Sequence, residues 1–279
     1  TGDLFATDNQ GNYNPFNELN HLQPGKRYGF INSLETKHGL KPAPTAPAID
    51  IPHPWTRSVN GLCFLHVPGE GEAAARERFG AFAGHLVGCE YDTRRLVRMS
   101  LEQVDGQYQG AVYPMSREPA PSDETLEGPV SCAVSPVGDL YIGNLRDSGW
   151  GAGSNTGSIV RLRRQGDPPP GIAEVRTRPG GFTIAFTQPI DRSRASDAAN
   201  YAVSSYRRIS TPAYGGEDVD RRIESIKLVR VADDGRSVDI DLPELREGFV
   251  YEFHLRELTP GDTFFPAEAY YTLRKQRSG

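Results

Sequence analysis

Several residue types and patterns are scarce in this chain of 279 residues. It contains two methionines, two tryptophans and three cysteines. No stretch approaches the roughly 18 consecutive apolar residues that a membrane helix needs, so no membrane span is expected. The formal net charge of −5 at pH 7 offers no electrostatic reason to expect a nucleic acid as partner.

The cysteines follow no metal-binding or haem-attachment spacing. Cys63, Cys89 and Cys132 each lie in an apolar, strand-like run, and their spacing matches no zinc motif. An odd count permits at most one internal disulfide, so buried free thiols and a single bridge between neighbouring strands both stay open. The chain also lacks a catalytic-triad motif, a phosphate-binding glycine loop and a Cys-x-x-Cys-His site, which removes the usual sequence evidence for those chemistries.

Glycine and proline, by contrast, are abundant, with 30 and 22 residues. This composition suits many short strands joined by turns and predicts an all-β protein. Three consecutive prolines at 168–170 cannot lie inside a sheet and favour a stiff linker. We therefore expect one domain over residues 1–166, a linker at 167–171 and a second domain over residues 172–279.

Short strand patterns separated by turn residues fill the first domain, and the only helix we expect there is at residues 70–79. Repeated bursts of this kind predict four-stranded propeller blades. The expected strands are at residues 3–7, 61–67, 85–91, 95–101, 108–113, 130–135, 139–144 and 158–163.

About seven strands are expected in the second domain, with a hairpin turn at residues 233–235. That number of short strands in roughly 105 residues is typical of an immunoglobulin-like sandwich. The expected strands are at residues 172–176, 181–187, 200–206, 223–231, 237–242, 249–255 and 269–273.

The chain opens with a strand, a polar loop and, after the Pro24-Gly25 turn, an expected second strand. Calcium prefers six to eight oxygen ligands from a flexible loop of this kind. A turn whose side chains satisfy its own backbone is the other interpretation. The candidate metal ligands are the loop's oxygen-bearing side chains: Asp8, Gln10, Asn12, Asn14 and Glu18.

His21 follows this loop and is the best candidate for a general acid or base, although a strand-edge histidine bonded to a carbonyl is the commoner case. Asp8 or Glu18 could serve as the acid or base of polysaccharide cleavage. Trp150 lies between glycines and either stacks on a sugar or fills the seam between blades. The residues expected at blade-edge loops, where propeller ligands bind, are Arg94, Arg146, Asp147 and Trp150.

The order of several short motifs resembles the C-terminal half of the glucose/sorbosone dehydrogenase family of six-bladed propellers. The motifs are residues 8–11 (Asp-Asn-Gln-Gly), 18–20 (Glu-Leu-Asn), Pro24-Gly25 and 28–30 (Tyr-Gly-Phe). Residues 157–162 resemble the strand that closes the ring. The resemblance is closer to a branch fused to haem-binding domains in secreted bacterial proteins, and residues 182–203 resemble the Ig-like modules of such proteins.

This resemblance implies a secreted or periplasmic, sugar-directed oxidoreductase that uses calcium and pyrroloquinoline quinone. It also implies a missing N-terminal propeller half, as a separate chain or lost by cleavage, and a fused or partner haem domain. The arginines that hold the quinone carboxylates in the family are absent from the matching residues 128–133, so binding of the quinone is not favoured. A non-catalytic carbohydrate-binding or scaffold propeller is the alternative.

Overall fold

The computed structural model describes residues 2–29, 33–39, 44–53, 55–117, 125–149, 153–261 and 263–278. The chain is mostly β, with 44% strand and 9% helix in several sheets, which confirms the all-β class. Some strands are buried along their whole length, such as the one at Leu86–Glu90, and others alternate between core and solvent. In the strand at Ser237–Asp241, for example, Val238 and Ile240 are buried while the flanking polar residues are not.

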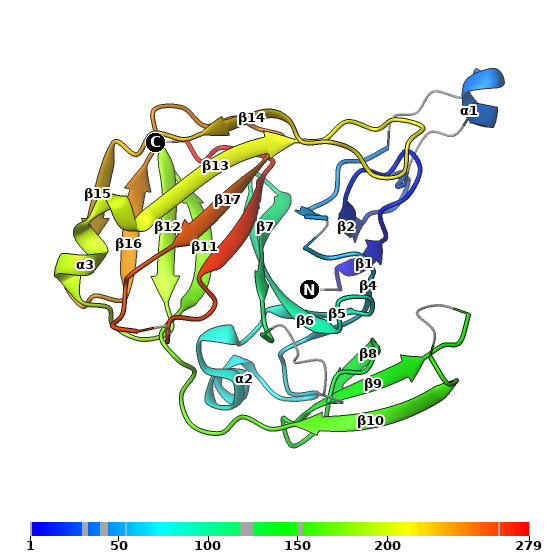
Figure 1. Cartoon of the computed structure of the whole chain (residues 1–279), viewed down its shortest axis with the longest axis horizontal. Helices are drawn as coiled ribbons and strands as arrows, with labels where there is room; N and C mark the ends of the chain where they lie inside the picture. Colours follow the sequence, from blue (N-terminus) through cyan, green and yellow to red (C-terminus); the bar gives the residue numbers. More distant parts are fainter. Residues whose placement is uncertain are drawn as a thin grey trace.

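The largest sheet contains eight antiparallel strands and includes both parts of the chain (Figure 1). Strand β18 of the C-terminal part pairs with β7 of the N-terminal part through Tyr270 with Val112 and Tyr271 with Ala111. The sheet therefore combines strands from both sides of the expected linker at 167–171. In spatial order its strands are β14 (Val219–Ile223), β13 (Tyr201–Arg207), β17 (Phe249–Leu255), β18 (Glu268–Leu273), β7 (Gln107–Pro114), β6 (Arg95–Val104), β5 (Leu86–Glu90) and β4 (Val59–Phe64).

A four-stranded sheet packs against the C-terminal strands of this large sheet. Phe182 lies at the centre of the shared core, with its ring 4.9 to 5.2 Å from those of Tyr251, Phe253 and Tyr271. Aromatic rings packed in this way bury much apolar area. The four strands, in spatial order, are β11 (Ile172–Arg178), β12 (Gly181–Phe186), β16 (Ser237–Asp241) and β15 (Leu228–Val231).

Two three-stranded sheets lie on opposite sides of β4 and β5 (Figure 1). Leu19 and Ile49 of the first sheet are buried in one core, and Ile142 of the second sheet is buried in another. The first sheet is formed by β1 (Leu4–Asp8), β2 (Asn17–Leu22) and β3 (Ile49–Ile51), and the second by β8 (Pro129–Val134), β9 (Leu140–Arg146) and β10 (Thr156–Leu162).

Three expectations about secondary structure are corrected. The segment expected as a loop at 17–22 is strand β2, because Asn17 and Leu19 are fully buried against the core; the segment after Pro24-Gly25 forms no strand over residues 26–29. The strand expected at 223–231 is two strands, β14 and β15, in different sheets. Every other expected strand segment contains a strand.

The helix expected at 70–79 is confirmed as α2 (Glu72–Phe79), but it is not the only one. Two helices of five residues, α1 (Ser33–Lys37) and α3 (Arg192–Ser196), also occur. Each is too short to show a helical period in the sequence. Helix α3 begins at the Asp191 cap, whose side chain accepts a hydrogen bond from the Arg194 N–H. Short 3₁₀ turns lie at Gly80–Phe82 and Ala198–Asn200.

Candidate functional site

The polar loop after β1 packs against residues 211–215, which connect β13 and β14. Asn12 donates from Nδ2 to the Pro212 carbonyl oxygen at 2.7 Å, and Tyr13 donates from its backbone to Thr211 at 2.8 Å. Gly215 in turn donates to the Gly11 carbonyl oxygen at 3.0 Å. These hydrogen bonds join the loop to a segment some 200 positions away in the sequence, a contact that the local sequence did not indicate.

The amide side chains expected to bind calcium also make hydrogen bonds to the backbone. Gln10 donates from Nε2 to the Pro15 carbonyl oxygen and Asn14 donates from Nδ2 to that of Asn9. These bonds use the amide nitrogens, whereas a calcium ion binds oxygens, and the buried Gln10 Oε1 atom has no hydrogen-bond partner among the described residues. Among the residues that the structure describes, no group of three or more His, Cys, Asp or Glu side chains could hold a metal ion. Calcium binding by this loop stays a prediction.

Three carboxylates form a row across the first three-stranded sheet. Asp8 lies opposite Glu18, and Glu18 lies opposite Asp50, on neighbouring antiparallel strands. Directly opposed residues point to the same face of a sheet, so the three side chains share that face. Arg274 partly neutralises the row, with its Nη2 atom 2.7 Å from Asp50 Oδ2.

Glu18, in the middle of this carboxylate row, is strongly perturbed. Burial, and then the charge of Asp50, raise the pKa of Glu18 to about 7, although Asn20 donates a hydrogen bond to its Oε2 atom at 3.1 Å. Burial also raises the pKa of Asp50, against the opposing effect of Arg274. Glu18 therefore titrates where a general acid or base is useful.

His21 is held by a carboxylate. Its Nε2 atom lies 3.2 Å from Asp3 Oδ1, and Asp3 Oδ2 accepts a hydrogen bond of 2.9 Å from the Tyr108 hydroxyl. The imidazole also stacks on Phe5, with ring centroids 5.2 Å apart. Within the described part of the chain, Asp3 is the only hydrogen-bond partner of the ring. A neutral His21 that donates from Nε2 to Asp3 leaves the Nδ1 lone pair available as a base.

This histidine lines a pocket of about 290 Å³ between the first three-stranded sheet and the β6–β7 turn. The pocket carries donors and acceptors of several kinds, including Gln23, Lys26 and Gln107. The Tyr108 hydroxyl is also in the wall, and burial together with its bond to Asp3 raises the pKa of this group, so it stays protonated. A mixed polar lining of this type suits a small polyhydroxylated ligand.

The two candidate catalytic residues, His21 and Asp8, are separated. His21 lies opposite Phe5 and Asp8 lies opposite Glu18, three positions further along β1. Because side chains alternate along a strand, Asp8 points to the face opposite that of Phe5 and His21. The structure thus places His21 in the pocket and Asp8 in the carboxylate row.

The expected blade-edge residues, apart from Trp150, meet at one corner. Arg94 donates from Nε to the Leu126 carbonyl oxygen at 3.0 Å, and Arg146 approaches the neighbouring Glu127 carboxylate at 3.4 Å. The backbone N–H of Asp147 donates to the Tyr91 hydroxyl at 3.3 Å. Trp150 lies outside the described residues.

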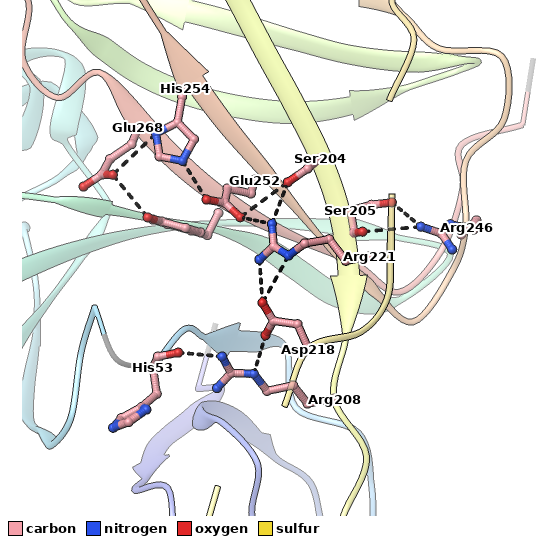
Figure 2. Close-up of polar contacts among 11 residues, drawn as sticks. His53, Ser204, Ser205, Arg208, Asp218, Arg221, Arg246, Glu252, His254 and Glu268 are labelled. Carbon is pink, nitrogen blue, oxygen red and sulfur yellow. Dashed lines mark hydrogen bonds and ion pairs between the residues drawn. The ribbon is translucent and has the colours of Figure 1, made fainter. Parts of the chain in front are cut away.

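A second polar network, which sequence reasoning missed, lies on the face of the large sheet opposite the Phe182 core (Figure 2). His254 lies between Glu252, 2.6 Å from its Nε2 atom, and Glu268, 3.7 Å from its Nδ1 atom. Glu252 also accepts a hydrogen bond of 2.8 Å from Arg221 Nη1. Burial alone would raise the pKa of Glu252, but these hydrogen bonds from His254 and Arg221 hold it at about 2.

Arg221 continues this network toward the first three-stranded sheet (Figure 2). It bonds Asp218 through Nη2 at 2.6 Å, and the other Asp218 oxygen accepts from Arg208 Nε at 2.8 Å. Arg208 in turn donates to the His53 carbonyl oxygen at 2.6 Å. A chain of charge-assisted bonds therefore connects β17 with the segment that follows β3.

Sequence reasoning also missed Asp3, Tyr108, Asp50 and Arg274. Asp3 was treated as a strand residue, and Tyr108 lies 105 positions from it. The one available sign was the alternation in β2, which places His21 on the same face as the buried Leu19. It does not reveal the partner on another strand.

Comparison with known proteins yields no relative: no protein-family model, no curated protein and no solved structure matches this chain. No helix in the described ranges is long and apolar enough to cross a membrane. The function must therefore be argued from the residues themselves.

Proposed function

We propose that the His21 pocket binds a sugar and that His21, oriented by Asp3, removes a proton from one of its hydroxyl groups. The observation that carries this proposal is the 3.2 Å contact between His21 Nε2 and Asp3 Oδ1 at a pocket lined by polar groups. A carboxylate in this position fixes the imidazole tautomer and stabilises the imidazolium that forms after proton transfer.

The enzymatic form of this proposal is a secreted sugar-directed oxidoreductase of the glucose/sorbosone dehydrogenase type. Removal of the hydroxyl proton prepares the alcohol to lose a hydride, which a separate acceptor would have to take up. That acceptor must be a two-electron acceptor such as a quinone or a supplied dye, because a haem takes one electron at a time; the haem domain that the resemblance implies could only carry the electrons onward.

A non-catalytic carbohydrate-binding propeller is the second candidate. One observation favours it: the loop that resembles the family's cofactor loop is occupied by contacts to residues 211–215. In this alternative the pocket selects a sugar and His21 only donates or accepts hydrogen bonds.

The proposed architecture is a set of propeller blades joined to an immunoglobulin-like sandwich. The antiparallel meander β4–β7 supports the blade assignment. The strand orders β11-β12-β16-β15 and β14-β13-β17-β18 support the sandwich, because they correspond to an A-B-E-D sheet facing a C′-C-F-G sheet.

Titration of the full chain with a panel of aldoses and disaccharides, followed by NMR of the histidine ring protons, tests the proposal. We expect a sugar to shift the His21 resonances and His21→Gln to weaken binding at least tenfold. His66→Gln, which changes an exposed histidine far along the sequence, is the matched control and should bind normally. Asp3→Asn tests the orienting role.

Dye-linked oxidation of the bound sugar separates the two candidates. Turnover in the parent chain with a supplied acceptor, lost in His21→Gln and Asp3→Asn, supports the oxidoreductase. Binding without turnover supports the carbohydrate-binding propeller. If no sugar in the panel shifts the His21 resonances, the proposed function is wrong.

A further inference from the structure

The three cysteines of the chain converge on one place in the fold, although they are up to 69 positions apart in the sequence. Cys63 lies on β4, Cys89 on β5 and Cys132 on β8, and all three belong to the core between β4–β5 and the β8–β10 sheet. The Cys132 Sγ atom lies 3.6 Å from the Gly61 carbonyl oxygen of β4 and 3.8 Å from that of Val87 on β5, and Val87 is the residue directly opposite Cys63. All three are free thiols in the structure.

The backbones that carry Cys63 and Cys132 come unusually close. A Cβ atom built on Gly61 would lie 2.5 Å from the Cα atom of Ser131, so only a glycine permits this approach of β4 and β8. Cys132 Sγ itself lies 3.6 Å from the Gly61 carbonyl oxygen. Disulfide partners need Cα atoms about 4.4 to 6.8 Å apart, which requires backbones in close contact of this kind.

We propose that Cys63 and Cys132 form a disulfide under oxidising conditions and that Cys89 remains a thiol. Cys63 and Cys132 are both partly exposed, whereas Cys89 is fully buried at 0% exposure. An external oxidant therefore has better access to the first two residues than to the third. The bond joins the β8–β10 sheet covalently to the eight-stranded sheet.

The chemistry is thiol–disulfide exchange with a small disulfide oxidant such as oxidised glutathione. The thiolate of one cysteine attacks the oxidant, forms a mixed disulfide and releases one reduced thiol. The second cysteine then attacks the protein-bound sulfur, closes the Cys63–Cys132 bond and releases a second reduced thiol. The two protein thiols lose two electrons and two protons, and the oxidant gains both.

The surroundings predict that this exchange is slow at neutral pH. The hydrogen bond with Cys132, and then burial, raise the pKa of the Cys63 thiol above its usual value, and only the thiolate attacks. The rate of oxidation should therefore increase with pH across the alkaline range. A surface thiol with an ordinary pKa would reach its maximal rate earlier.

Peptide mapping of the full chain after incubation with oxidised glutathione tests the proposal. We expect a linked pair of peptides containing Cys63 and Cys132, an intact mass lower by two hydrogen atoms, and alkylation of Cys89 alone after unfolding. The oxidised chain should melt several degrees higher than the reduced chain, and dithiothreitol should reverse the shift. Cys89→Ala should retain the bond, whereas Cys132→Ser should lose it.

Two results would overturn the inference. One is a linked pair that contains Cys89, in the parent chain or its variants. The other is alkylation of all three cysteines after prolonged oxidation of a chain that still shows a cooperative melt. A circular-dichroism melt of each reduced variant shows whether it is folded, so a loss of the bond is not confused with a loss of the fold.

Discussion

Arg98 of β6 donates a hydrogen bond from Nη2 to the backbone carbonyl oxygen of Ile172, 2.9 Å away, at the first residue of β11. Its Nη1 atom donates to the next carbonyl, that of Ala173, at 2.6 Å. The guanidinium lies between the rings of Phe82 and Tyr113, 4.1 and 4.2 Å from their centroids. One buried cation thus joins the two parts of the chain that the proline run separates.

Replacing this arginine with an apolar residue of similar length should destabilise the whole molecule. Arg98→Met retains much of the buried volume but leaves two carbonyl oxygens without donors, which should cost roughly 3 kcal/mol. Urea unfolding measures the free energy of unfolding. Arg236→Met, which changes an exposed arginine, should cost less than about 0.5 kcal/mol. Equal losses in the two variants would contradict the bridging role of Arg98.

The close approach of β4 and β8 at Gly61 predicts that adding a side chain there lowers the stability of the fold. Gly61→Ala would place a Cβ atom 2.5 Å from Ser131 Cα and 2.6 Å from the Val130 carbonyl oxygen, so the backbone must move. We expect a loss of about 1–3 kcal/mol in unfolding free energy. Gly71→Ala is the matched control because nothing lies within 4 Å of its added Cβ atom. A neutral Gly61→Ala would show that β4 and β8 are further apart.

Glu18 should make the protein less stable as the pH rises. Its folded pKa, about 7, lies above the ordinary glutamate value of 4.5, so the folded state holds the proton more tightly than the unfolded state between these pH values. Glu18→Gln should remove this dependence and stabilise the protein by up to about 3 kcal/mol above pH 7. At pH 4 the variant and parent should be alike. Urea unfolding at several pH values measures the difference, with the exposed Glu77→Gln as control. If the unfolding free energies of the parent and Glu18→Gln change in parallel with pH, the raised pKa of Glu18 is refuted.

His254 should also make the stability depend on pH, but here the folded state favours the charged form of the side chain. Its hydrogen bond to Glu252 raises its pKa above 6.5, so the folded state favours the imidazolium. The resulting stabilisation is fully present below pH 6.5 and is lost as the pH rises through the folded pKa. His254→Gln should therefore lower the melting temperature at pH 6 and leave it nearly unchanged at pH 9. His66→Gln should have no effect at either pH, and a pH-independent loss in His254→Gln would indicate a packing defect instead.

Local residue patterns were sufficient for much of the fold. Alternation and turn residues located nearly all the strands, because a half-buried strand needs apolar side chains at every second position. The failures have local causes. Strand β2 was treated as a loop because it contains the polar residues Asn17 and Asn20, which are nevertheless buried; Asn17 donates to the distant Thr56 and Asn20 donates to Glu18 within the strand. Strands β14 and β15 were merged because nothing in residues 223–231 marks the passage from one sheet to the other.

The candidate site was predictable only in part. His21 was singled out from the sequence, but its position opposite Phe5, away from Asp8, follows from strand register. Glu18 was considered as a metal ligand and as an acid or base, but its raised pKa comes from burial and then from the charge of Asp50, a residue on a strand that the sequence did not indicate. The calcium interpretation depended on loop composition and stays a prediction, since the structure shows only the nitrogens of those amides bonded to separate carbonyl groups.

The sequence by itself determined the all-β class, the strand-rich parts on either side of the proline run, and His21 as a candidate base. Only the tertiary structure decided that β7 and β18 share one sheet, that Asp3 and Tyr108 surround His21, and that three distant cysteines meet in one core. The physical reason is the range of the interactions. Alternation and turn preferences act between neighbouring residues, whereas strand pairing and buried polar contacts depend on which surfaces the folded chain brings together.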